Sequence, residues 1–229
     1  MFDMPWYLVT YEPLCFRRAG QRAIEQHGYA PFVDFSCRRE PDLEAKPPAI
    51  SALCRKQWFA PRLEEGDVVV YLSKKGSYGT HATPFWYLVA VLKVRKTFSS
   101  HPEAAAWYRQ RRRQLPRNCV VTGNRALPLS HTGRTKADLK KLKLTLAGWK
   151  TQYLAIASDF PEFVACTRLS VRLHRPRVLA AATAERALGH APITQTPKAE
   201  PARNVRRLLA AAGMRVAGRE QRRRNGRHR

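Results

Sequence analysis

The amino-acid sequence predicts an α+β protein, built as a mostly antiparallel β-barrel with short helices packed at its ends. Two continuous apolar runs, Val68–Leu72 and Phe85–Val94, are typical of strands that are buried on both faces or line a closed barrel. The segment between them holds no helical crossover, so we expect the two strands to pair antiparallel. Strands and helices do not alternate regularly along the chain, which argues against a doubly wound parallel sheet.

Three further elements precede these strands. The aromatic and β-branched segment Trp6–Tyr11 predicts a strand, and Arg18–His27 predicts a short helix or turn closed by Gly28. The stretch Tyr29–Ile50 then contains four prolines and reads as irregular, apart from a short strand expected over Phe32–Phe35. Structureless loops of this length are uncommon in compact domains, so we expect this one to be functional.

Helices and a closing strand follow. Ser100 and Glu103 have the spacing of a capping box, which predicts a helix over His101–Gln114. The lysine-rich segment Thr135–Gly148 predicts a second helix, and the alternating pattern of Phe163–Leu173 predicts a half-exposed closing strand.

The composition changes after residue 178, so we expect a domain over residues 1–178 and a basic extension rich in Ala, Arg and Pro over residues 179–229. Helices are expected over Ala180–Leu188 and Val205–Val216. The basic segment Gln221–Arg229 is expected to be a disordered tail.

The charge balance points to a polyanionic partner. The 229 residues include 42 Lys and Arg against 17 Asp and Glu, a formal net charge of +25. Solubility does not require so large an excess, and nucleic acid is its usual partner. We therefore expect DNA or RNA to be the ligand. A merely basic protein from an arginine-rich proteome is the alternative.

The cysteines indicate a reduced interior rather than a metal site. They are widely spaced, with no C-x-x-C pair and no zinc-finger spacing, so we expect buried thiols, no metal and no cofactor. No apolar run approaches the ~20 residues needed to span a membrane, and the N-terminus does not resemble a signal peptide. A cytoplasmic protein without a membrane partner is expected. The five cysteines are Cys15, Cys37, Cys54, Cys119 and Cys166.

Three local patterns resemble the PUA-like superfamily, which includes the EVE, ASCH and YTH domains. They are the strand Trp6–Val9, the segment Gly66–Leu72, and a strand ending in Val94–Phe98 that leads into the helix start His101–Glu103. The resemblance implies a PUA-like barrel and a nucleic-acid ligand, often with a modified base held in an aromatic or polar pocket.

The chain is also similar to the nucleotide-modification-associated domains of phage and bacterial proteins. Gly28–Pro31, Cys37 and Lys46–Ile50 resemble their G-x-A-P, Cys and K-P-x-I series in order, and Asn118–Val121 resembles a later segment. The likeness covers roughly residues 6–178. Arg38–Ala45 is more polar than that pattern and the basic tail has no counterpart, so the resemblance does not identify the base.

The long loop is our first candidate for the ligand site. Ser36 and Cys37 offer a hydroxyl and a thiol to a base edge, and Lys46 offers an ammonium to a phosphate or carbonyl oxygen. Cys37 as a buried structural thiol is the open alternative. Trp58 and Tyr78 are the preferred stacking rings, because both lie in polar surroundings at the ends of elements.

Clusters of basic residues are the candidates for phosphate contacts. A solvated helix face is the alternative for the arginines, but few acids lie near enough to pair with them. The predicted phosphate-binding residues are Lys74, Lys75, Arg109, Arg111, Arg112, Arg113, Lys136 and Lys140.

The leading hypothesis is a nucleic-acid-binding module that recognises or handles a modified nucleotide through a pocket beside the barrel. The alternative is an enzyme of nucleotide or base modification that uses the same pocket. No catalytic residue is assigned, although some ASCH-type relatives are hydrolases that use Lys, Thr and Glu, which Lys46, Thr10 and Glu44 or Glu64 would match. A structural basic protein without a pocket is the third hypothesis. DNA against RNA, the base and the oligomeric state stay open.

Overall fold

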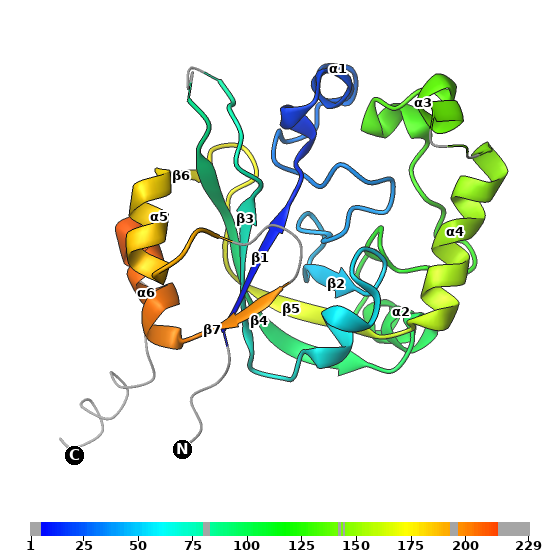
Figure 1. The fold of residues 1–229 in the computed structure, drawn as a ribbon. Helices are drawn as coiled ribbons and strands as arrows, with labels where there is room; N and C mark the ends of the chain where they lie inside the picture. Colours follow the sequence, from blue (N-terminus) through cyan, green and yellow to red (C-terminus); the bar gives the residue numbers. More distant parts are fainter. Residues whose placement is uncertain (1–5, 80–82, 142, 144, 193–196, 215–229) are drawn as a thin grey trace, which may run out of the picture.

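The structure is a computed structural model that describes residues 6–79, 83–141, 143, 145–192 and 197–214. It is an α+β fold with one seven-stranded sheet (Figure 1). The strands are β1 (Trp6–Tyr11), β2 (Ala49–Ser51), β3 (Val68–Ser73), β4 (Trp86–Phe98), β5 (Phe163–Val171), β6 (Arg177–Leu179) and β7 (Lys198–Glu200). The α-helices are α1 (Arg18–His27), α2 (His101–Gln110), α3 (Lys136–Lys141), α4 (Leu146–Asp159), α5 (Ala181–Leu188) and α6 (Ala202–Ala211). The 3₁₀ turns are η1 (Leu14–Phe16), η2 (Lys56–Trp58), η3 (Ala60–Arg62) and η4 (Leu129–Thr132).

The predicted barrel is wrong, because the sheet is open. Its strand order is β2-β5-β4-β3-β1-β7, and β6 pairs with β4 outside this path. Closure needs the two edge strands to pair with each other. Here both edge strands, β2 and β7, are three residues long, and within the described residues they do not pair with each other. The predicted antiparallel pairing of β3 with β4 is confirmed.

One strand pair of the sheet is parallel. β1 runs beside β3 with Trp6 opposite Val68 and Tyr11 opposite Ser73, so the carboxyl ends of these two strands lie at the same place. The other pairs, β1–β7, β2–β5, β3–β4, β4–β5 and β4–β6, are antiparallel. The loops that follow these two adjacent carboxyl ends therefore start side by side, and such loops often bind ligands.

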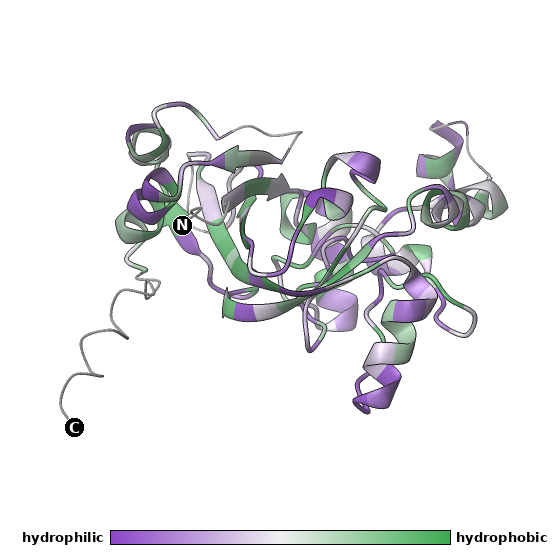
Figure 2. Cartoon of the chain, turned by 90° about the horizontal axis from the view of Figure 1, so that it is seen from below, coloured by the Kyte–Doolittle hydropathy of each residue, from purple (hydrophilic) through white to green (hydrophobic). Residues whose placement is uncertain are grey.

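Both faces of the central strands are buried, as their apolar sequence predicts. Val68 and Val70 of β3 pack with α5 and α6 on one face, whereas Val69 and Tyr71 pack on the other face with a core that includes Phe32. Figure 1 shows α5 and α6 on one side of the sheet and the long loop with α1, α3 and α4 on the other. In Figure 2 the central strands are mostly green, and the outer helices carry both colours.

The long loop (residues 29–48) is packed against the sheet rather than open to solvent. Its polar segment is largely buried: Arg38, Arg39, Glu40 and Asp42 are each less than a tenth exposed. The strand predicted over Phe32–Phe35 is reduced to a single bridge between Pro13 and Asp34. Backbone groups of this loop are satisfied by buried side chains instead of a strand partner, which explains its polar sequence.

Several helix predictions differ from the structure in their ends; α6 spans Ala202–Ala211, whereas the sequence predicted Val205–Val216. α2 begins as predicted, with the Glu103 amide donating to the Ser100 hydroxyl at 3.3 Å, but it ends at Gln110 because Arg111 leaves helical geometry and Arg112 has a positive φ of 52°. The segment predicted as one helix over Thr135–Gly148 contains α3 and only the first residues of α4, which continues to Asp159.

The C-terminal segment contributes to the same sheet. β7 pairs with β1, and Val205, Leu208 and Leu209 of α6 pack with Trp6 and Leu8 of β1 in one buried cluster. The part of the predicted extension that the structure describes is thus packed on the sheet. The predicted tail Gln221–Arg229 lies outside the described residues. Among the helices that can be described, none has the length and apolar character required to cross a membrane.

Candidate nucleic-acid interface

Two adjoining cavities open beside the Lys46-Pro47-Pro48 segment of the long loop. Their volumes are about 490 and 640 Å³, and Lys46 and Arg113 line both. We call the two together the Lys46 groove. The smaller cavity is also lined by Tyr29, Asp42, Glu44, Ala45, Arg112, Gln114, Leu115, Arg117 and Leu127. The larger one is also lined by Pro47, Pro48, Arg95, Trp107, Arg111, Cys166, Thr167 and Arg168.

The larger cavity is lined by cations without compensating acids. Five basic side chains contribute to its wall, and no Asp or Glu is found among its described lining residues. The five are Lys46, Arg95, Arg111, Arg113 and Arg168. Because no carboxylate shares this wall, the charge of its lining favours an anionic ligand.

Neighbouring groups fix the positions of three of these guanidiniums. Arg111 lies over the Trp107 ring, 4.2 Å from its centroid, and Arg95 lies 5.6 Å from the same centroid. Arg168 donates to the carbonyls of Leu43, Glu44 and Ala45 at 2.7–2.9 Å. Side chains held in this way lose little conformational entropy when they bind an anion.

Asp42, in the smaller cavity, is part of the loop's internal structure. Its carboxylate accepts from the backbone amides of Arg117 at 2.6 Å, Glu44 at 3.1 Å and Ala45 at 3.0 Å. These bonds join the loop to the segment after α2, so they bring Lys46 close to Arg113 and Arg117. Asp42 therefore organises the groove more than it opposes its charge.

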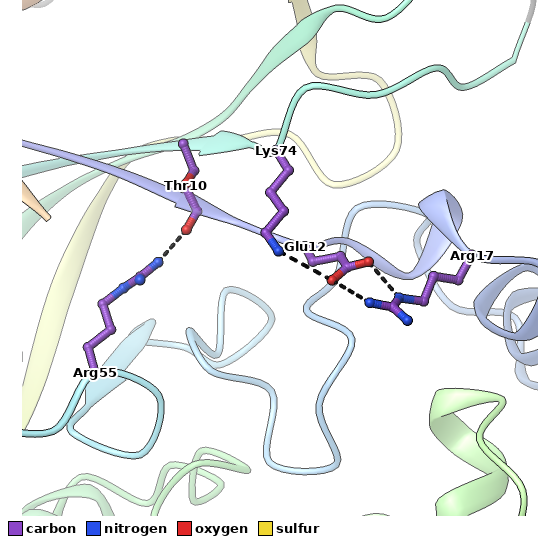
Figure 3. Close-up of polar contacts among 5 residues, drawn as sticks. All are labelled: Thr10, Glu12, Arg17, Arg55 and Lys74. Carbon is purple, nitrogen blue, oxygen red and sulfur yellow. Dashed lines mark hydrogen bonds and ion pairs between the residues drawn. The ribbon is translucent and has the colours of Figure 1, made fainter. Parts of the chain in front are cut away.

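A third cavity, of about 310 Å³, lies at the carboxyl end of the parallel pair β1–β3. We call it the strand-end cavity. It is lined by Thr10, Tyr11, Glu12, Asp34, Phe35, Ser36, Glu40, Cys54, Arg55 and Lys74. Figure 3 shows Lys74 and Arg17 pointing toward Glu12 from two sides, and Arg55 pointing toward the Thr10 carbonyl, to which it donates.

Glu40 is a buried acid in this wall. Its carboxyl accepts from the Ser51 amide at 3.0 and 3.1 Å, from the Ser51 hydroxyl at 2.5 Å and from the Asn118 amide at 2.7 Å. Burial is the main cause that raises the pKa of Glu40 to about 8, with the charge of Asp34 adding to it. A carboxyl of this pKa carries its proton at neutral pH and can lose it.

The predicted ligand residues are separated by the fold. Ser36 lines the strand-end cavity, and Lys46 lines the groove. Cys37 is fully buried beside Leu127, Leu139 and Trp149, and burial raises the pKa of its thiol to about 12. Its environment is that of a core thiol, so we leave Cys37 out of the proposed site.

The two predicted stacking rings lie outside these three cavities. Trp58 is 52% exposed in η2, with the Arg62 guanidinium 4.8 Å from its centroid. Tyr78 is partly buried in the β3–β4 connection and meets Phe32 edge to face at 5.4 Å. Trp58 is the more accessible of the two rings.

The residues predicted to bind phosphate lie at different places in the structure. Arg111, Arg112 and Arg113 lie in the Lys46 groove, and Lys74 lies at the strand-end cavity. The remaining four are exposed but do not line the three cavities: Lys75, Arg109, Lys136 and Lys140.

Sequence patterns alone did not point to several lining residues. Arg95 sits where the register of β4 against β5 shifts between Val94 and Lys96, and such a bulge redirects a side chain. Arg168 reaches the loop from β5, a contact between residues more than 120 positions apart. Asp34 and Glu40 could have been suspected from the sequence. Acids are scarce in this chain, and both of these lie in the long loop.

Within the described residues, no group of three or more His, Cys, Asp and Glu side chains is arranged to hold a metal ion. Comparison with known proteins adds no identity: no protein-family model matches the chain, and no curated protein matches it.

Proposed function

We propose that this protein binds nucleic acid through the Lys46 groove and recognises or handles a modified nucleotide through a pocket beside the sheet. One observation carries the proposal: five cationic side chains line a single cavity of about 640 Å³ without a carboxylate among them. The net charge of +25 and the resemblance to the PUA-like and nucleotide-modification-associated domains support the same ligand class.

The groove suits a phosphate backbone better than a small anion. Its two cavities adjoin at Lys46 and Arg113, so the basic wall is longer than one phosphate needs. Arg111, held against the Trp107 ring, presents a guanidinium plane on which a base can stack. Single-stranded nucleic acid offers both the phosphates and the unpaired bases.

The test is binding of labelled single-stranded DNA and RNA, followed by fluorescence anisotropy. The double variant Lys46→Glu/Arg113→Glu reverses two charges that line both cavities, and we expect affinity to fall by more than about tenfold. Lys150→Glu/Arg186→Glu is the matched control, because both residues are exposed on other helices and the change in net charge is the same. Equal losses in the two variants would show that total charge, and not the groove, binds the nucleic acid.

The enzyme hypothesis has one specific observation in its favour. Glu40 is a buried carboxyl in a cavity wall with a pKa of about 8, the range in which an acid–base catalyst works at neutral pH. A panel of modified nucleosides and nucleotides, analysed by mass spectrometry, tests it. Turnover that disappears in Glu40→Gln would favour an enzyme, and an unchanged panel would favour a binding module.

A further inference from the structure

The strand-end cavity has the features of a pocket for one planar polar ring. Its volume of about 310 Å³ lies at the lower end of the ~300–1,000 Å³ range of ligand sites, which suits a single heterocycle. Tyr11 and Phe35 supply aromatic walls. The cavity lies apart from the Lys46 groove, since the two share no lining residue.

The polar groups in this wall are fixed and well buried. Asp34 is 7% exposed and Glu40 is 6% exposed. Asp34 accepts from the Ser36 amide at 2.8 Å and from the Glu40 amide at 2.9 Å, and both bonds end on its Oδ1 atom. The Ser36 side chain also hydrogen-bonds the Asp34 carboxyl. A carboxylate has about four acceptor sites, so Asp34 retains capacity to accept from a ligand. The Ser51 and Asn118 bonds hold Glu40 and engage both of its carboxyl oxygens.

The cations lie on a different part of the wall. Lys74 and Arg55 follow β3 and β2 respectively, and they contact Glu12 and the Thr10 carbonyl beside the ends of the parallel strands. A ligand that fits both parts would have a flat ring with hydrogen-bond donors at one end and an anionic group at the other.

From this juxtaposition we propose that the strand-end cavity binds the nucleobase of a nucleotide that carries an exocyclic amino group, with Asp34 accepting from the amino group and Lys74 and Arg55 facing the phosphate. Carboxyl groups are the usual partners of the cytosine N4 amino group. Uracil and thymine lack an amino donor at this position, so the pocket should discriminate against them. The proposal deepens the proposed function and rests on it, because it names the class of base that the bound nucleic acid or nucleotide presents.

The test compares CMP with UMP by isothermal titration calorimetry, since their rings differ only at the amino-bearing edge. We expect CMP to bind about tenfold more tightly, the factor for one hydrogen bond to a carboxyl group. Asp34→Asn retains an Oδ1 acceptor for the two backbone amides but replaces Oδ2 with a donor, so it should remove or reverse the preference. Asp159→Asn, an exposed change at the end of α4, is the charge-matched control.

A second variant blocks the cavity without changing its charge. Cys54 lines the cavity and is the exposed cysteine of the chain, so Cys54→Phe should fill the pocket and weaken CMP binding at least tenfold. Gln57→Phe, an exposed neighbour that does not line the cavity, should leave CMP binding unchanged. If Cys54→Phe fails to fold, the ratio of CMP affinity to UMP affinity in the wild-type protein still tests the proposal.

Equal affinities of the wild-type protein for CMP and UMP, or a ratio that Asp34→Asn leaves unchanged, would overturn the inference. Binding of labelled oligonucleotides, measured on the same samples, separates this failure from a failure of the proposed function. Salt-dependent oligonucleotide binding with no CMP preference would refute only the pocket. A CMP preference with no oligonucleotide binding would refute the groove.

Discussion

If the Lys46 groove contacts phosphates, removing its cations must change the salt dependence of binding and not only the affinity. The logarithm of the binding constant falls with the logarithm of salt concentration by ~0.7 for each single-strand phosphate neutralised. Five cations line the larger cavity. If each of the five cations neutralises one phosphate, the logarithmic plot of binding constant against salt has a slope of about −3.5. The affinity then falls about 100-fold between ~50 and ~200 mM salt.

The double variant Lys46→Ala/Arg113→Ala removes two of these five cations. The predicted slope becomes about −2.1, so the loss over the same salt range shrinks to about 20-fold. Fluorescence anisotropy at four or more salt concentrations measures both slopes. The control Lys150→Ala/Arg186→Ala lowers the net charge equally and should keep the wild-type slope. A slope that is the same in all three proteins would refute the reasoning, because the bound phosphates would then lie elsewhere.

Three further predictions concern stability. The raised pKa of Glu40, about 8 in the folded protein, means that the native state holds a proton that the unfolded state loses above its ordinary pKa. Stability should therefore fall as pH rises from ~4.5 to ~8, by up to about 5 kcal/mol, and urea unfolding of Glu40→Gln should lack this slope. His131, whose ring centroid lies 3.9 Å from that of the stacked His27, has a pKa lowered by burial first and then by His27 and Arg39, so its contribution to stability should be lost progressively as pH falls below ~6.5. His131→Gln should reduce the difference in urea midpoint between pH ~7.5 and ~5.5, whereas an unchanged difference would assign the acid sensitivity to other groups. Gly133→Ala places a Cβ atom 1.7 Å from the Ala19 carbonyl at a φ of 67° and should cost more than about 2 kcal/mol, whereas Gly28→Ala at the same φ meets nothing within 4 Å and should cost about 1 kcal/mol in thermal unfolding. Similar costs for the two glycine variants would contradict that packing argument.

Elements with a strong local pattern could be predicted from the sequence. The apolar run of β3 predicted a strand buried on both faces, and Ser100 with Glu103 predicted the start of α2. The sheet's closure was not predictable in this way. Whether β2 and β7 meet depends on the length and placement of three-residue strands, which local propensity does not determine.

The candidate site was predictable as a segment but not as a set of contacts. Patterns in the chain placed function in the long loop, and the loop does border all three cavities. They could not show that Ser36 and Lys46 face different cavities, or that Arg95 turns toward the groove at a bulge. Such contacts depend on register and on long-range packing, and a composition or motif carries neither.

Both proposed sites depend on one buried guanidinium that fixes the loop between them. Arg39 is 1% exposed and donates to the carbonyls of Asp34 at 2.7 Å, Ser36 at 3.1 Å and His131 at 3.1 Å, while it lies 4.6 Å from the Tyr29 ring centroid. These carbonyl acceptors, together with the nearby carboxyls of Asp34 and Asp42, stabilise the buried charge, so contacts within the protein hold the loop. A preformed loop spends little free energy on ordering when it binds. Occupation of the strand-end cavity should therefore change the groove little, and the two sites should contribute to binding nearly independently.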